Sequence, residues 1–544
     1  MKVRSVVRGL VVATILAMLG ALLPQLASAA PEKASGRYLV RARSSADYTA
    51  LRAKAVKEGA RVVRDLKQVN TMVVSANSAT RTSLAADPRT LGVARDGLRR
   101  LTTERSAPNL AAPGLRSATR VQAKAPAATA AAGINPDPAF DYKGLLWDYR
   151  RIGLPQGWKT TAGSPKVTVG VADTGLDFTH RELASKVTQV VDFTTLEDPP
   201  ICATSFGASD ADMAAEFGGP EKTDWNGHGS WIGGRIAGAL NGTGINGIAP
   251  KVNLVALKIS QWCGSAYDST IISAFLDAAT RGLDIVSISF GGYLDRSDPE
   301  QDAAYQTYAA TVAYARSKGT VIVASAGNES VRVGAGGRVL SHGPTVTPAE
   351  EPVFDDIFGQ YEVPGGVPGV VDVSSTGRVV VPSSANCPPG SEGTPDDNFS
   401  PICKPITDLH QAAGQGKQNQ LAYYSSYGPR IDIAGPGGAR KFNLSGFDRG
   451  GTPGFPYTNS DLTNAWEVFS TTSNWAVEIP CFTFGSGSGF PLRQCYSTIQ
   501  GTSMAAPQVS GSLALIASAH PSLRKHPAAL LHRLKALANT NLHN

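Results

Sequence analysis

Three short segments of the sequence contain the side chains that nucleophilic catalysis requires. Ser503 lies between a glycine turn and an apolar helical stretch at 509–517. His228 has a glycine on either side, and Asp173 ends an apolar run at 167–172. A serine hydroxyl is a weak nucleophile near neutral pH, so a nearby base must accept its proton and a third group must orient that base. The three residue types therefore predict acyl transfer through a serine.

Each of these residues also has an ordinary structural explanation. A serine at the start of a helix is a favoured N-cap, a lone histidine is more often structural than catalytic, and an aspartate after a strand commonly caps a turn. The chemical interpretation adds that the start of the helix aims backbone N–H groups and the positive end of its dipole at Ser503. Asp173 would lie at the carboxyl edge of a sheet, where active sites of α/β folds gather.

Taken together, the local contexts and the order Asp, His, Ser resemble the subtilisin-like serine peptidases. The blocks that carry the resemblance are Val171-Ala172-Asp173-Thr174-Gly175, His228-Gly229-Ser230 and Gly501-Thr502-Ser503-Met504-Ala505-Ala506-Pro507. The resemblance covers roughly 145–544 and implies that Asp173, His228 and Ser503 form a catalytic triad. A fourth block, Ala324-Ser325-Ala326-Gly327-Asn328-Glu329, implies that Asn328 donates to the oxyanion beside the N–H of Ser503. An asparagine after a glycine also fills turns.

The same resemblance implies two strands that bind substrate, namely Ser289-Phe290-Gly291 and Gly264-Ser265-Ala266. Glycines let another backbone approach closely, so an extended peptide would add as a strand between them. Polypeptides are therefore the expected substrates. Glu329 resembles a residue at the floor of the first specificity pocket, and without other acids there we expect a broad, mainly apolar preference.

No cofactor is expected for catalysis. The family often binds calcium at surface loops, and Glu182 and Asn241 fall where it places two oxygen ligands. The alternative is that both are solvated surface residues. None of the six cysteines has the CxxC spacing of a zinc site.

The alternation of strand-like and helical patterns from residue 145 onward predicts an α/β fold with a mainly parallel sheet flanked by helices. Short apolar runs separated by helical stretches are typical of such a buried sheet; they lie at 167–172, 252–257, 285–289 and 321–324. We assign 137–544 to this peptidase domain. Its stretch at about 330–480 is rich in Gly, Pro and Ser and is predicted to form inserted loops that either narrow the cleft or are inert. Two segments within this stretch, 370–374 and 424–429, look like family core.

A small α+β unit is predicted in front of this domain, and it resembles the family's propeptide. We assign 30–104 to the propeptide, which would inhibit the enzyme from its own cleft, and 105–136 to an Ala- and Pro-rich linker with the processing site. Residues 31–136 hold 19 basic and 7 acidic side chains, whereas 137–544 have a net charge of −8. The uneven charge argues against nucleic acid as a partner and favours attraction between the two parts. The alternative is a solvated basic face without a partner.

The first residues are predicted to be a signal peptide, 1–29. Lys2, Arg4 and Arg8 precede an apolar run, and small residues end with Ala29, after which we place the cut. The alternative, a membrane anchor, is disfavoured by the short run. We therefore expect a secreted, extracellular monomer without an anchor.

Export makes pairing of the cysteines expected. Closeness in sequence favours Cys387 with Cys403 and Cys481 with Cys495, which leaves Cys202 for Cys263, although fifteen pairings are open. One departure from the family pattern is Ser230-Trp231 after the histidine block, where a threonine and a second histidine are usual. Two rivals to a general protease are a non-catalytic binding protein on the same scaffold and a processing enzyme for a single partner.

Overall fold

The computed structural model describes residues 36–101, 146–242, 244–343, 356–377, 421–422, 424–438, 468–479, 482–483 and 494–539. The predicted signal peptide and linker lie outside these residues, as do Cys387, Cys403 and Cys481. Within the described ranges no helix is both long and apolar enough to cross a membrane.

A parallel sheet of seven strands forms the centre of the body, in the order β15-β14-β12-β10-β6-β8-β7. The strands are β6 (Thr168–Asp173), β7 (Val187–Asp192), β8 (Asn253–Lys258), β10 (Ile285–Ile288), β12 (Val321–Ser325), β14 (Val371–Thr376) and β15 (Ile433–Pro436). The four predicted apolar runs are strands of this sheet. They are nearly continuous in Val, Ile, Leu and Ala because both faces of the sheet are covered.

Helices cover both faces of this sheet, which confirms the predicted α/β fold. One face packs against α8 (His228–Ala237), α12 (Thr502–Ala519) and α13 (Pro527–Leu537), and the other against α9 (Asp268–Arg281) and α10 (Pro299–Ser317). Successive residues of β6 divide between the two layers: Val171 contacts the first and Ala172 the second. Both α8 and α12 contact β6, and the two helices contact each other.

The front of the chain folds as a separate α+β unit with its own core. An antiparallel sheet in the order β2-β3-β1-β4 carries two helices on one face. The elements are β1 (Gly36–Ala42), α1 (Ser45–Lys57), β2 (Arg61–Leu66), β3 (Thr71–Ala76), α2 (Ser78–Ala85) and β4 (Thr90–Arg95). Ser44 and Asn77 cap the two helices by accepting backbone N–H bonds.

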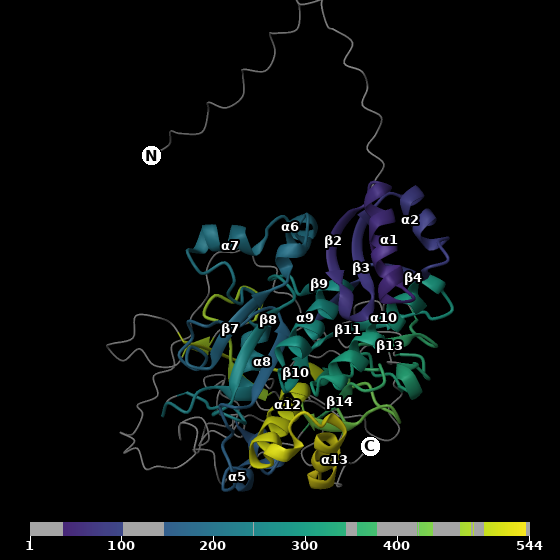
Figure 1. Ribbon diagram of the computed structural model, residues 1–544. Helices are drawn as coiled ribbons and strands as arrows, with labels where there is room; N and C mark the ends of the chain where they lie inside the picture. The colour runs from purple at the N-terminus through teal and green to yellow at the C-terminus, as the bar shows by residue number, and fades with distance from the viewer. Residues whose placement is uncertain are drawn as a thin grey trace, which may run out of the picture.

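The other face of the front sheet lies on α10 of the body (Figure 1). The backbones approach closely there, because a Cβ on Gly92 would lie 2.8 Å from that of Ala303. Opposite charges meet across the contact, as predicted from the uneven charge, in the pairs Arg61–Asp198, Arg81–Glu300 and Arg99–Asp268.

Several smaller elements complete the body. They are α4 (Trp147–Arg151), α5 (Leu154–Gly157), α6 (Ile201–Phe206), α7 (Asp210–Phe217), β13 (Tyr361–Val363), β16 (Val468–Thr471), β17 (Phe482–Thr483) and β18 (Cys495–Ile499), with short 3₁₀ turns between elements. The sequence had not predicted α6 and α7. The histidine helix α8 ends at Ala237, so Leu240 lies beyond it and is 41% exposed.

Candidate active site

Asp173 and His228 meet at the carboxyl edge of the central sheet. Asp173 is the last residue of β6, and His228 is the first residue of α8. The Nδ1 atom of His228 lies 2.8 Å from Oδ1 of Asp173, and both side chains are fully buried. The opposite ring nitrogen, Nε2, has no hydrogen-bond partner among the described residues. The imidazole is therefore fixed on one side and available for proton transfer on the other.

A second carboxylate, Asp224, organises the backbone around this pair. It accepts hydrogen bonds from the N–H of Gly227 at 2.8 Å and of Ser230 at 2.7 Å, on either side of the histidine. It also accepts from the hydroxyl of Thr174 at 2.8 Å, whose oxygen in turn accepts from the N–H of Gly229 at 3.0 Å. The turn after β6 and the start of α8 are thus connected through buried hydrogen bonds.

Only glycine fits after the histidine. A Cβ on Gly229 would lie 2.1 Å from the carbonyl oxygen of Gly175, a contact with backbone that no small adjustment relieves. This close packing places α8 directly against the strand that ends in Asp173.

Ser503 is the second residue of α12, and Asn328 lies beside it. The Oδ1 atom of Asn328 accepts from the N–H of Thr502 at 3.0 Å and from its hydroxyl at 2.8 Å. These bonds fix the oxygen end of the amide, so its donor end is turned away from Thr502. The hydroxyl of Ser289 donates to the carbonyl oxygen of Ser503 at 3.4 Å. Helices α8 and α12 pack against each other. The segments that contain Asp173, His228 and Ser503, which are far apart in the sequence, therefore share one edge of the fold.

The two predicted substrate strands stand opposite each other with a strand of the same chain between them. They are β9 (Ser265–Tyr267) and β11 (Phe290–Leu294), and between them lies β5 (Leu98–Leu101), in the sheet order β13-β11-β5-β9. Gly264 immediately precedes β9 and accepts from the N–H of Leu101 at 3.1 Å. Ser289 lies just outside the strand that was predicted to contain it, between β10 and β11. The strand β5 had not been predicted.

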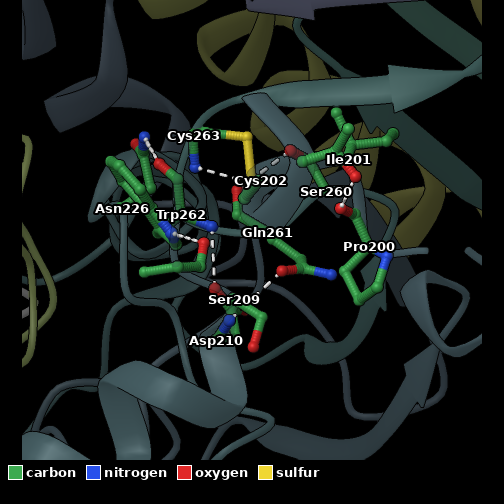
Figure 2. The surroundings of a disulfide bond; sticks show 12 residues. Pro200, Ile201, Cys202, Ser209, Asp210, Asn226, Ser260, Gln261, Trp262 and Cys263 are labelled. Atoms are coloured by element: carbon green, nitrogen blue, oxygen red, sulfur yellow. Dashed lines mark hydrogen bonds between the residues drawn. A yellow bond between two sulfur atoms is a disulfide. The ribbon is translucent and has the colours of Figure 1, made fainter. Parts of the chain in front are cut away.

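A disulfide bond cross-links α6 to the residues that precede β9, and we call these segments together the wall. Cys202 at the start of α6 is bonded to Cys263, as the pairing by closeness predicted (Figure 2). Cys495 is disulfide-bonded as well. Beside the first bond, the N–H of Trp262 donates to Asp210 at 2.8 Å, and the carbonyl of Trp262 accepts from Asn226 at 2.6 Å (Figure 2). Because Asn226 also accepts from the N–H of His228 at 3.1 Å, the wall is connected to the histidine.

Glu197 joins the two sides of this disulfide loop. Its Oε2 accepts from the N–H of Ile201 and from the side-chain amide of Gln261, both at 3.1 Å. Burial raises the pKa of Glu197 to about 8. The glutamate is therefore held largely protonated at neutral pH.

The expectation that Glu329 has no acidic companions is wrong. Glu329 is half-buried, and its carboxylate accepts from the hydroxyl of Tyr293 at 2.7 Å. Its charge acts on Glu362, which in turn interacts with Asp372, and burial raises the pKa of all three carboxyl groups. A broad apolar preference at this place therefore does not follow from an absence of acids.

The two predicted calcium ligands, Glu182 and Asn241, lie together. Asn241 donates its side-chain amide to Glu182 at 3.2 Å, and the hydroxyl of Tyr496 donates to the same carboxylate at 2.9 Å. Hydrogen-bond donors thus surround Glu182, whereas calcium requires several oxygen ligands. No group of three or more acidic, histidine or cysteine side chains suited to a metal occurs in the described part of the chain. Calcium binding remains a prediction.

Sequence reasoning missed Asp224 and Thr174 as positioning residues. Asp224 stands four residues before the histidine, and Thr174 directly follows the aspartate, so both were inside or beside the quoted motifs. A buried carboxylate that receives several N–H bonds has no recognisable sequence pattern, because its partners are backbone groups.

Comparison with known proteins gives one family. The family model described as the subtilase family matches residues 164–543. Thermitase from Thermoactinomyces vulgaris is 32% identical over 194 residues, which cover 35% of this chain and 57% of thermitase. Subtilisin DY from Bacillus licheniformis is 34% identical over 173 residues, which cover 32% of this chain and 50% of that protein. The chain thus spans about half the length of these curated relatives.

Solved structures with the same fold extend over nearly the whole chain. The epidermin leader peptide processing serine protease from Staphylococcus aureus has a TM-score of 0.55 and 18% identity, and the match covers 92% of this chain and 92% of that one. Fervidolysin from Fervidobacterium pennivorans, a keratinolytic enzyme related to subtilisin, has a TM-score of 0.53 and 19% identity, with 90% of this chain and 56% of that one covered. These likenesses show a common fold. With the family match over residues 164–543, they establish that this chain belongs to the subtilase family.

Proposed function

We propose that this protein is a serine endopeptidase that hydrolyses peptide bonds in polypeptides through an acyl-enzyme on Ser503. The observation that carries the proposal is the buried contact of 2.8 Å between His228 and Asp173, with the second imidazole nitrogen left without a partner among the described side chains. Such a histidine is oriented to act as a base at Nε2. Membership of the subtilase family gives independent support.

In the proposed reaction Nε2 of His228 accepts the proton of Ser503 while Oγ forms a bond to the carbonyl carbon of the substrate. The protonated imidazole is stabilised by Asp173 and then gives its proton to the leaving amine as the peptide bond breaks. Asn328 and the N–H of Ser503 donate to the oxyanion of the tetrahedral intermediate. A water molecule, deprotonated by the same histidine, releases the acyl group.

We further propose that the protein is made as a self-inhibited precursor and exported. The support for self-inhibition is that β5, at the end of the front unit, pairs with both β9 and β11, the strands to which a substrate would add. Export is supported by the pattern of the first 29 residues and by the bond between Cys202 and Cys263. The front unit would leave the cleft after cleavage within the following segment.

A fluorophosphonate probe tests the nucleophile directly. Protein from the culture medium should be labelled once, at Ser503, and the Ser503→Ala variant should not be labelled. His228→Ala should also lose labelling, while Ser512→Ala, a serine on the same helix, should keep it. Equal labelling of wild type and Ser503→Ala, or none of either, would sink the proposal and leave the non-catalytic binding protein as the better account.

A processing enzyme with few substrates is the second candidate. It is favoured by α6, α7 and the Cys202–Cys263 bond, which together form a wall beside β9. Such a wall restricts the conformations that a bound substrate can adopt there. Digestion of a mixed peptide library separates the two: a processing enzyme leaves most peptides intact, and a general protease does not.

A further inference from the structure

One side chain of β5 enters a buried acidic pocket of the body. Nε of Arg99 donates to Oδ1 of Asp268 at 2.7 Å, and Nη2 donates to Oδ2 at 2.9 Å. The hydroxyl of Tyr308 also donates to Oδ1 of Asp268, at 2.7 Å. Arg99 is only 8% exposed, and Asp268 and Tyr308 are fully buried. The arginine is thus held by both carboxylate oxygens, in the geometry that suits a guanidinium and no other side chain.

The pocket is built by the body and not by the front unit. Asp268 is the first residue of α9, Tyr308 belongs to α10, and Gly292 of β11 lies beside the guanidinium. A Cβ on Gly292 would lie 3.2 Å from both Cδ and Nη1 of Arg99, so a larger residue there would crowd the arginine. These groups stay with the peptidase domain when the front unit leaves.

The neighbouring side chains of β5 show that the burial is specific to one position. Leu98 is 47% exposed, and Arg100, the next basic residue, is exposed as well. Arg99 pairs in register with Ala266 and Arg100 with Ser265, so alternate side chains face into and out of the body as in any strand. Within β5, Arg99 is therefore the residue whose charged side chain is buried against the body.

We propose that Asp268, with Tyr308, forms a specificity pocket that selects arginine in substrates at the place Arg99 occupies in β5. This inference rests on the proposed function, because it assumes that a substrate adds between β9 and β11 as β5 does. Once β5 has left, Asp268 keeps the hydrogen bond from Tyr308 but has lost its cationic partner. A substrate arginine restores the two hydrogen bonds and the charge. A side chain that cannot do so leaves Asp268 unpaired and is discriminated against.

Lysine is a poorer fit than arginine at this place. Its ammonium group cannot donate to both oxygens of one carboxylate in the planar arrangement that Arg99 shows. Citrulline has nearly the shape of arginine but no charge. The expected order of kcat/KM is therefore arginine, then lysine, then citrulline and alanine, with roughly a tenfold to hundredfold span, the range that loss of a charge-assisted pair gives.

Cleavage-site profiling of the mature protein on a randomised peptide library tests the proposal. The library should show an arginine preference at one position, and individual peptides that carry arginine, lysine, citrulline or alanine there should follow the stated order. Peptides based on residues 96–107 provide a matched comparison, because Arg99→Ala should lower cleavage at least tenfold and Arg100→Ala by less than twofold.

Variants of the pocket complete the test. Asp268→Asn should remove the arginine preference, and Tyr308→Phe should weaken it, whereas Asp277→Asn, a carboxylate elsewhere on α9, should leave it unchanged. Should Asp268→Asn fail to fold, the peptide series on the wild-type enzyme and Tyr308→Phe still decide the question. A protein that the fluorophosphonate labels at Ser503 but that shows no arginine preference at any position would overturn the pocket alone. Absence of labelling would instead overturn the proposed function.

Discussion

Two buried arginine–aspartate pairs connect different parts of the molecule. Arg235 of α8 contacts Asp148 of α4, both with 0% exposed side chains, and its guanidinium lies over the ring of Tyr149 at 4.5 Å. Arg99 instead joins the front unit to the body through two parallel hydrogen bonds to Asp268. The first pair joins elements that remain together, and the second joins parts that we propose separate. The buried pair in the interior therefore stabilises the body, whereas the pair between the two units contributes, in our proposal, to substrate recognition.

Removing the acid of the interior pair should have the largest effect. Asp148→Ala leaves the guanidinium of Arg235 buried without its carboxylate and should lower the free energy of unfolding by about 3–5 kcal/mol. Asp148 also accepts from the side-chain amide of Gln508 on α12, so the loss should spread to the helix of Ser503. Thermal or urea denaturation measures the change.

A surface pair serves as the control for this comparison. Lys535 contacts Asp432 with a side chain that is 45% exposed. Lys535→Ala should cost less than about 1 kcal/mol, because solvent screens the pair. Equal losses for the buried and the exposed pair would contradict the distinction between them.

Removal of the Cys202–Cys263 disulfide should have the second-largest effect. The double substitution of Cys202 and Cys263 by serine removes a cross-link that spans 61 residues and should cost about 2–4 kcal/mol. Because the bond holds the wall at β9, the loss should also raise hydrogen exchange in Ser265–Tyr267. A loss of stability without any change in that strand would show that the bond does not organise the cleft.

Loss of the Arg99–Asp268 pair should affect the docking of β5 more than the stability of the body. In the full chain that carries Ser503→Ala, Arg99→Ala should speed hydrogen exchange at Leu98–Leu101 roughly thirtyfold, equivalent to about 2 kcal/mol. Arg100→Ala should leave exchange there within about twofold, since its side chain is exposed. An unchanged exchange rate in the Arg99 variant would mean that the pair does not hold the front unit in place.

The smallest effect is the dependence of stability on pH through Glu197, which lies beside the Cys202–Cys263 bond. The pKa of Glu197 is raised by burial to about 8 from an ordinary value of 4.5, so the folded state keeps a proton that the unfolded state releases. The stability that this proton contributes is fully present below about pH 4.5 and is lost as the pH rises to about 8. Glu197→Gln should therefore flatten the fall in stability across this window. Parallel pH profiles for variant and wild type would contradict the assignment.

Sequence patterns predicted four strands of the central sheet, β6, β8, β10 and β12, because these strands are apolar and buried on both faces. They also predicted that Asp173 lies at the carboxyl edge of this sheet, whereas the resemblance to the subtilisin-like peptidases grouped His228 and Asn328 with it. The bond between Cys202 and Cys263 followed from elimination of closer pairs.

The sequence could not predict the contacts that join distant segments through backbone or charge. The strand β5 has four residues, two of them arginines, and no apolar alternation, so that its pairing depends on β9 and β11 being already in place. Asp268 begins a helix, where an acidic residue is common, and nothing local distinguishes it from a capping residue. Of the buried acids near Glu329, Glu362 comes from β13, in a stretch that the sequence placed among inserted loops, and Asp372 comes from β14, which the sequence assigned to the core.

Intact mass measurement of the secreted chain tests the central claim, that Ser503 cleaves polypeptides and first of all its own precursor. Wild type should appear as two pieces, with the body beginning within residues 105–136, and Ser503→Ala should remain joined from the front unit to residue 544. A cut at the same place in both proteins, or a body that begins before residue 100, would contradict the account.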